Sequence, residues 1–377
     1  MNKNRISALV LTVVLAILAG LFVIANPKKA PAPEAAEYME YENAVVEQIL
    51  SDSTESDPVS EDHFRGSQKL ILRVKTGRYQ GQQMMADNTV GPIYGCPMEV
   101  GDGVTVGIST YADGTVRCYV YEYNRFPGLL LVLAAFLLVT VLVGGRVGLK
   151  SLVSLGMTVA ALLFILLPLL LKGWPTIPTT FLVSVLVTIA TFVILSGVDK
   201  KTMCACLGTL AGILLATLFG MLAQHLLRID GYRQEYAEAL LQLRQTGESP
   251  IGITGLITAG VIVSALGAVM DVAMSISSAI QELTRVNPDL TSGDLLRSGM
   301  NIGRDMVGTM TNTLILAILG SGLTLVVYIY SLGLQPWQLL SSAYMSLEAI
   351  SGVASSIGVM LAVPFTAAIC AAVFGKK

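Results

Sequence analysis

Long apolar segments recur along this 377-residue chain, and they constrain its fold more than any other feature. Each is longer than the roughly 17 residues that a helix needs to cross the hydrocarbon core of a bilayer. Within hydrocarbon, an isolated segment satisfies its backbone hydrogen bonds only as a helix. The sequence therefore predicts a polytopic α-helical membrane protein of about eight spans, at residues 6–25, 126–143, 151–171, 179–197, 202–227, 251–276, 306–332 and 339–374.

Composition supports this class and excludes others. Hydrophobic residues make up 53% of the chain and charged residues 13%, with a mean hydropathy of +0.68, whereas soluble domains carry about 25% charged residues. The formal net charge is -2, and the 24 lysines and arginines are scattered, so no basic face suited to nucleic acid is present. We expect the partners to be the lipid bilayer and an unknown small solute or ion, and no nucleic acid.

A polar segment separates the first two apolar segments. Strings such as KLILRVKTG and TVRCYVYEY alternate apolar and polar residues, which is typical of strands. Five strands are predicted, at residues 44–50, 69–76, 78–86, 103–109 and 115–123. Five short strands with glycine at the turns suit a small all-β barrel of the OB kind, a likeness that by itself predicts no ligand.

Three domains follow from this pattern. Residues 1–5 are basic and precede about 20 apolar residues, longer than the ~7 to 15 of a cleavable signal peptide core, so residues 1–25 are predicted to be an uncleaved signal-anchor helix. Residues 26–125 form the small β-domain, and residues 126–377 the transmembrane helical domain.

Lysines and arginines in the short connections predict the orientation. With a cytosolic N-terminus, the cytosolic side carries Lys3, Arg5, Arg146, Lys150, Lys200, Lys201, Arg285, Arg297, Arg304, Lys376 and Lys377, and the outer loops carry Lys172, Arg228, Arg233 and Arg244. Both termini are then cytosolic and the β-domain is extracytosolic.

Residues 339–374 contain Glu348 and Pro364, so they form either one crossing or a broken, re-entrant element followed by a span. Seven to nine crossings are compatible with the sequence.

Two aspartates in or beside apolar segments are the first candidates for function, because a carboxylate at the middle of a bilayer helix costs roughly 2.5 to 3.5 kcal/mol. On a helix, Asp271 shares one face with Ser275, Ser278 and Glu282. After the Asn287-Pro288 turn the same spacing recurs in a second polar, small-residue stripe made of Asn301, Asp305, Gly308 and Asn312. We expect the two stripes to meet on neighbouring antiparallel helices.

Depth follows from the ~1.5 Å rise per helical residue. Asp271 would lie about 30 Å into its span and Asp305 just before the next, so both would line a cytosol-facing vestibule. Asn312 would lie roughly 10 Å deeper, Arg304 would supply a counter-charge to Asp271, and Glu348 is a separate candidate. The alternative is structural, since small-residue stripes pack membrane helices and an aspartate beside an arginine often fixes register.

An enzyme finds little support in the sequence. His63 and His225 are the only histidines, so neither a metal-ligand cluster nor a Ser/His pair is expected. No Gly-x-x-x-x-Gly-Lys string occurs, and nothing around Asp271 and Asp305 favours a proteolytic dyad. We expect no enzymatic activity, no cofactor and no metal site.

The five cysteines divide between the two kinds of segment. Cys204, Cys206 and Cys370 lie in apolar stretches, where burial as small hydrophobes is expected. Cys96 and Cys118 lie in the polar domain, and outside the cytosol they either form a disulfide or remain free.

Three strings carry a family resemblance: GAVMDVAMSISSAIQEL, SGMNIGRDMVGTMTNTLILA and EAISGVASSIGVMLAVP. They resemble the YibE/F family of bacterial multi-spanning membrane proteins, and the resemblance extends from about Phe126 to the end. It implies a predicted permease of the bacterial cytoplasmic membrane without an assigned substrate. Asp271, Asn301, Arg304, Asp305 and Glu348 lie in or beside the matching strings, but the resemblance gives none of them a role.

Two functions are therefore carried forward. The first is a permease or secondary transporter in which Asp271 and Asp305 bind a proton, ion or solute while the helices rearrange. The second is a membrane scaffold or accessory protein whose outer β-domain docks a partner. Glycine-rich helix faces, such as the one with Gly252 and Gly255, also permit a homo-oligomer or a partner membrane protein.

Overall fold

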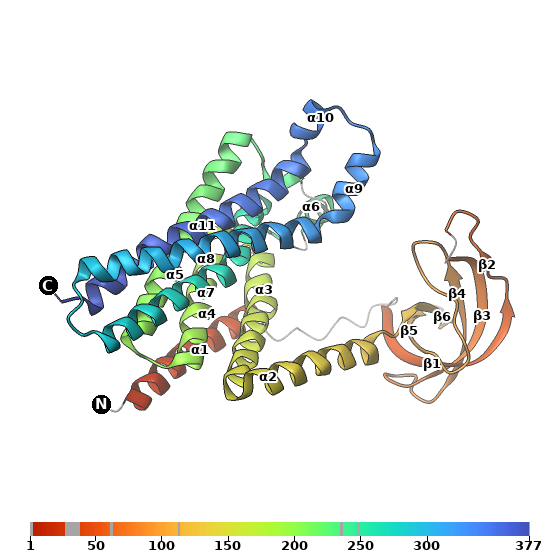
Figure 1. The fold of residues 1–377 in the computed structure, drawn as a ribbon. Coiled ribbons are helices and arrows are strands. Elements are labelled where there is room, and N and C mark those ends of the chain that lie inside the picture. The colour runs from red at the N-terminus through yellow and green to blue at the C-terminus, as the bar shows by residue number, and fades with distance from the viewer. Residues whose placement is uncertain are drawn as a thin grey trace. The chain divides into compact units, whose positions relative to one another are not determined.

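The computed structural model describes residues 3–26, 38–60, 63–111, 114–233, 237–247 and 249–376. The chain divides into two compact units (Figure 1). One unit comprises Met1–Pro27 and Val143–Lys377, and the other comprises Lys28–Leu142.

A closed five-stranded barrel forms most of the second unit. The strands are β1 (Tyr38–Asp52), β2 (Glu55–Ser56), β3 (Phe64–Val74), β4 (Gln83–Val90), β5 (Gly103–Thr110) and β6 (Val116–Tyr123). Their order is β1-β5-β6-β4-β3, and β1 also pairs with β3 and closes the barrel, while the two-residue β2 extends β3. The β4–β6 pairing is parallel and the other pairings are antiparallel. The prediction of a small five-stranded barrel is confirmed.

The barrel interior is apolar with one polar network. Alternate residues of β3 and β5, among them Leu70 and Val106, are fully buried. Gln68 and Asn88 are also buried, but Asn88 Nδ2 donates to Gln68 Oε1 at 2.9 Å and the Met98 amide donates to the same oxygen at 2.8 Å. Gln68 Nε2 in turn donates to Asp52 Oδ2 at 2.8 Å. This network satisfies polar atoms that would otherwise be costly to bury.

The other unit is helical, and α2 begins in the barrel unit and continues into it. The α-helices are α1 (Lys3–Ala25), α2 (Phe126–Ala161), α3 (Leu167–Leu171), α4 (Thr176–Ser196), α5 (Lys200–Leu227), α6 (Ala237–Gln245), α7 (Leu256–Val286), α8 (Ser292–Ser321), α9 (Leu323–Ser331), α10 (Pro336–Leu340) and α11 (Ala343–Phe374). A π-helix, η1 (Leu162–Leu166), joins α2 to α3, and two 3-10 turns, η2 (Gly231–Arg233) and η3 (Ile253–Gly255), precede α6 and α7.

Among the described residues, six helices are long and apolar enough to cross a membrane, or seven if the bent pair α8 and α9 forms one span. The prediction of about eight spans is confirmed only as six or seven candidate helices, because two of the predicted segments, 126–143 and 151–171, lie in one 46-residue helical stretch that is kinked at Gly145. Only at Gly145 does the backbone of α2 leave helical geometry, with φ 54° and ψ -132°. That left-handed φ favours glycine, so the Gly-Gly pair is a kink and not the predicted loop.

The sequence left two alternatives for residues 339–374, and residues 343–374 form the continuous helix α11, despite Pro364. A break lies instead at Gly322, where α8 and α9 are bent by 61°. One boundary differs from prediction, because α8 starts at Ser292, before the predicted span. A capping box made by Thr291 and Asp294 begins this helix. Because the first turns of the helix are polar, a search for apolar segments does not detect its start.

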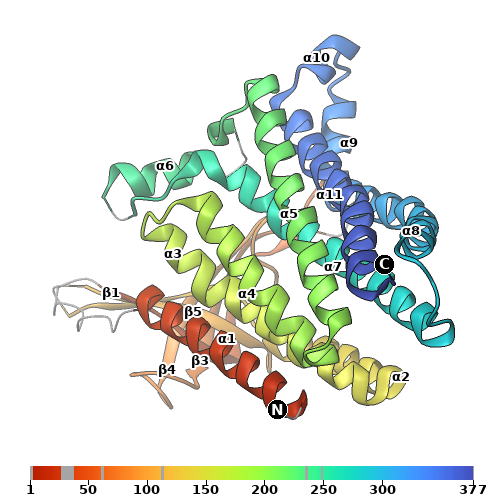
Figure 2. The same cartoon turned by 90° about the vertical axis from the view of Figure 1, so that its left-hand side faces the viewer.

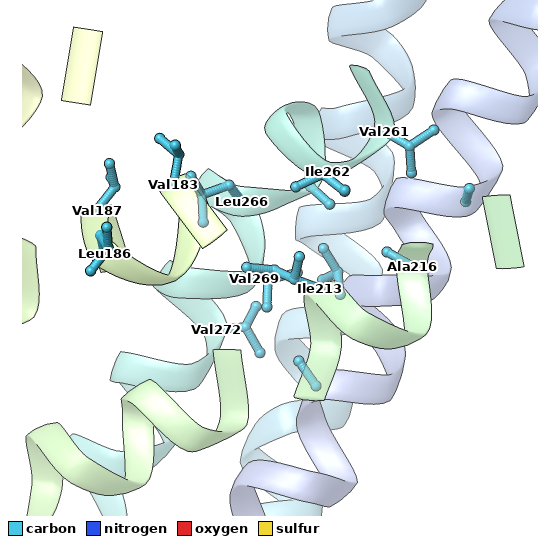
Figure 3. Close-up of a cluster of buried hydrophobic side chains, with 14 of the residues drawn as sticks. Val183, Leu186, Val187, Ile213, Ala216, Val261, Ile262, Leu266, Val269 and Val272 are labelled. Atoms are coloured by element: carbon cyan, nitrogen blue, oxygen red, sulfur yellow. The ribbon is translucent and has the colours of Figure 1, made fainter. Parts of the chain in front are cut away.

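The core of the helical unit lies where α5, α7 and α11 pack together, with α4 and α8 against its flanks (Figures 1 and 2). Figure 3 shows side chains of α4, α5 and α7 meeting in this core, including Val183, Ile213 and Val269. Glycine permits the close approach, because a Cβ on Gly212 of α5 would lie 2.7 Å from Val269 Cγ1 and 2.8 Å from Ala362 Cβ of α11. Such small-residue contacts are the usual means by which membrane helices associate.

Candidate functional site

The first polar stripe lies on the outward side of α7. Buried side chains such as Val269, Val272 and Ile276 direct one side of this helix into the core, while Asp271 and Ser275 are exposed on the opposite side. Asp271 occupies the midpoint of α7, about 22 Å from either end. The stripe on α7 therefore faces away from the core of its own chain.

The second stripe lies on the outward side of α8. Gly299 and Gly303 face α11, and a Cβ on Gly299 would lie 2.9 Å from Ala367 Cβ. The predicted stripe is exposed along the opposite side of the helix, as is Arg304: Asn301, Asp305, Gly308 and Asn312. Asp305 lies within α8, about 20 Å from its first residue. Asp271 and Asp305 thus lie at similar distances from the turn that joins α7 to α8.

The candidate side chains have no partner among the residues that the structure describes. Within the described part of the chain, no hydrogen bond or ion pair involves the side chains of Asp271, Asn301, Arg304, Asp305, Asn312 or Glu348. Each of the six is exposed, so none of the candidate carboxylates is buried. Instead of meeting inside one chain, the two stripes lie on its surface, and Arg304 makes no ion pair with Asp271.

The turn between α7 and α8 is tied to the end of the chain. Lys376 Nζ lies 2.6 Å from Asp289 Oδ1, and the Ser292 amide donates to the Lys376 carbonyl at 3.3 Å. These contacts bring the α7–α8 turn and the C-terminal end of α11 to the same end of the helical unit.

Glu348 lies apart from the stripes, at a cavity of ≈ 180 Å³ beside the bend between α8 and α9. Its described lining comes from α8, α9 and α11, includes Gly322 and Gly352, and is apolar except for Glu348. The cavity adjoins the 61° bend, and Glu348 lies on its α11 wall.

Polar groups that the sequence analysis did not select lie inside the bundle. The hydroxyl oxygens of Ser184, Thr311, Ser356 and Thr366 are buried and have no hydrogen-bond partner among the described residues. Serine and threonine are common in membrane helices, so the sequence did not distinguish these four residues as candidate site residues. Groups of three or more His, Cys, Asp and Glu that could hold a metal ion do not occur in the described ranges.

All five cysteines are free thiols. Cys204 and Cys370 are buried and Cys206 is half-buried, as expected. Cys96 and Cys118 were left open by the sequence, and both are unbridged here. Burial raises the pKa of the Cys118 thiol to about 11.

Comparison with known proteins identifies one family. The sequence model of the YibE/F-like protein family matches residues 132–376, which confirms the resemblance carried by the three strings. No curated protein and no solved structure matches the chain. The matched range includes α7, α8 and α11 and every candidate residue, whereas the barrel lies outside it.

Proposed function

This chain belongs to the YibE/F-like family of multi-spanning membrane proteins, and on that premise we propose that it is a permease. It moves a small solute or ion across the bacterial cytoplasmic membrane as a secondary transporter and catalyses no covalent reaction. The observation that carries the proposal is Asp271, a carboxylate that lies at the midpoint of a 31-residue apolar helix and has no partner among the described residues. Ionisable groups in membrane helices commonly mark ion and substrate paths.

The proposed mechanism uses the cost of charge in hydrocarbon. An ionised Asp271 or Asp305 disfavours burial in the bilayer by about 2.5 to 3.5 kcal/mol, and a bound proton or cation removes most of that cost. Occupancy therefore changes which arrangement of α7 and α8 is preferred, as transport requires. Asn301 and Asn312 supply uncharged ligands. Arg304 supplies a positive charge that pairs with an anion or with a carboxylate that holds no proton or cation.

The proposed orientation places both termini in the cytosol and the barrel outside it. The excess of lysine and arginine in the predicted cytosolic connections supports it. The strand order of the barrel, closed by β1–β3 with β4 parallel to β6, supports assignment to the OB kind.

Flux through reconstituted vesicles tests the proposal. Vesicles with a pH-sensitive dye inside would receive a panel of cations, anions and small solutes, with wild type compared with Asp271→Asn and Asp305→Asn. Asp230→Asn is the matched control, because Asp230 is exposed in the connection between α5 and α6 and lies outside both stripes. We expect solute-dependent flux in wild type and in the control, and loss of flux in folded stripe variants. Equal flux in all four proteins would refute a role for these carboxylates.

Thermal unfolding of the purified protein measures ligand binding independently of flux. A ligand present at ~100 times its dissociation constant stabilises the folded state by about 2.7 kcal/mol. Stabilisation by one solute that disappears in both stripe variants, but not in Asp230→Asn, would identify the ligand.

The alternative is a scaffold or accessory protein whose barrel docks a partner. It is favoured by exposed apolar side chains on the barrel, including Met39, Tyr41, Met85 and Tyr121. The rings of Tyr41 and Tyr121 pack edge to face at 4.9 Å, and tyrosine and methionine are enriched in protein interfaces. A scaffold should tolerate Asp271→Asn and Asp305→Asn but lose its activity in cells when residues 38–123 are deleted.

A further inference from the structure

Exposed polar stripes lie on the outward sides of α7 and α8, and we refer to the two together as the outer polar face. We define it by Gly267, Asp271 and Ser275 of α7 together with Asn301, Arg304, Asp305, Gly308 and Asn312 of α8. All of these residues are exposed, and the charged and amide side chains among them have no partner in the described part of the chain. The candidate transport residues of these two helices therefore lie on the surface of a single chain.

Packing within the chain does not explain the small residues of this face. A Cβ on Gly299 would lie 2.9 Å from Ile280 Cδ1 and from Ala367 Cβ, so that glycine is needed where α8 meets its neighbours. A Cβ on Gly267 or Gly308 would meet nothing within 4 Å. The two glycines on the outer polar face are free to accept larger side chains in the monomer, so their small size leaves room for another molecule.

Lipid chains cannot satisfy the polar side chains of the outer polar face. Hydrocarbon offers no hydrogen-bond partner, and polar and charged side chains in spans almost always face a bundle interior or a water-filled cavity. The core of the present bundle lies on the other side of both helices. A second protein surface is therefore needed to cover the outer polar face.

We infer that a second copy of this chain covers it, forming a two-fold dimer. The outer polar face carries both signs of charge, with Arg304 next to Asp305 in the chain and Asp271 at a similar distance from the α7–α8 turn, so it is complementary to itself, as an interface between two identical surfaces must be. Asp271 lies about 22 Å and Asp305 about 20 Å from the α7–α8 turn. A two-fold axis along the membrane normal keeps equal depths opposite each other, so Arg304 of one copy meets carboxylates of the other at the same level. The open glycines let the helices approach closely.

The second copy is the partner that completes the proposed transport site. What the dimer means for transport rests on the proposed function. In the dimer, Asp271 and Asp305 of both copies are enclosed between the chains instead of facing lipid. The ion or solute path then runs along the interface, and each copy supplies one wall.

Disulfide cross-linking of the full chain in native membranes tests the dimer. Ser275→Cys and Gly308→Cys place thiols on the outer polar face, and Leu218→Cys is the control on an exposed position of α5, with the wild-type cysteines as background. We expect oxidation to produce a band of twice the chain's mass with the first two variants and not with the control. Bands at the mass of this chain plus a different protein, or no band from either stripe position, would overturn the inference.

Charge exchange tests the pairing, with dimer fraction measured by single-molecule photobleaching in lipid bilayers. Arg304→Glu should weaken dimerisation at least about tenfold, and a second change, Asp271→Arg or Asp305→Arg, should restore it. An unchanged dimer fraction in Arg304→Glu would overturn the charge pairing.

The two proposals fail in different ways. Flux from vesicles that hold single chains would overturn the dimer while leaving the permease intact. A stable dimer that shows neither flux nor ligand binding would leave the interface intact and remove the permease.

Discussion

Replacing Gly212 with alanine tests the packing that holds the candidate site in place. This glycine lies on α5 where α5, α7 and α11 meet, and it is buried. A Cβ there would lie 2.7 Å from Val269 Cγ1, 2.8 Å from Ala362 Cβ and 3.0 Å from the Gly358 carbonyl oxygen. Ordinary contacts begin near 3.4 Å, and two of the three neighbours are a Cβ and a backbone atom that no side-chain rotation can move.

Gly220, two turns later on α5, is the matched control. It is also buried, but a Cβ there would lie 3.6 to 3.8 Å from the side chain of Val261, which is normal contact. Both substitutions change glycine to alanine in the interior of one helix, so the gain in helix propensity, about 1 kcal/mol, cancels in the comparison. The difference isolates overpacking, which costs about 1 to 3 kcal/mol.

Equilibrium unfolding in mixed micelles, with rising dodecyl sulfate and helicity as the readout, measures this difference. We expect Gly220→Ala to unfold at the wild-type midpoint or later, and Gly212→Ala to lose about 1 to 3 kcal/mol relative to it. A loss of that size changes the folded-to-unfolded ratio about fivefold or more. Equal midpoints for the two variants would refute the close crossing of α5, α7 and α11.

Three further predictions concern the barrel. Gln68→Leu leaves the buried Met98 amide without its acceptor and removes one of the two acceptors of Asn88 Nδ2, so thermal unfolding should show a loss of about 1 to 3 kcal/mol; an unchanged midpoint would contradict the network. Because burial raises the pKa of Cys118 to about 11, mass spectrometry should find its reaction with a maleimide at pH 8 far slower in the folded protein than after denaturation. Hydrogen bonds from Thr54 lower the pKa of Asp52, so its stabilisation is complete above the ordinary carboxyl pKa and is lost as pH falls through the lowered value. Amide hydrogen exchange of the barrel should record that loss in wild type and a flatter profile in Asp52→Asn.

The barrel was predictable from its sequence because alternating burial leaves a local trace. In β3 and β5, buried and less buried positions alternate along most of the strand, and the predicted strands at 69–76 and 103–109 overlap them. The first six residues of β1 were missed because YMEYEN is polar, yet they pair with β5. Closure by β1–β3 and the parallel β4–β6 pairing join segments that are distant in sequence, so no local pattern reveals them.

The helices were predictable as apolar segments, but their ends were not. The length of an apolar segment reveals neither a capping box, such as that of Thr291 and Asp294, nor the non-helical backbone of Gly145. In the same way, the spacing of Asp271 and Asp305 placed each on a polar helix face, but the direction of that face depends on α11, which follows later in the chain. The sequence alone therefore indicated which residues share a stripe and not whether a stripe points inward.

Lipid chains are as apolar as leucine, so apolar surface alone gives membrane helices little reason to associate. The helical unit must rely on close contacts, and its buried glycines supply them, Gly212 toward α7 and α11 and Gly299 toward α11. Gly308 and Asp271, on the outward sides of α8 and α7, take no part in these contacts. Their residue types are therefore not required by the fold of one chain. Changes on the outer polar face should alter binding or assembly while the monomer stays folded, whereas alanine at Gly212 or Gly299 should destabilise it.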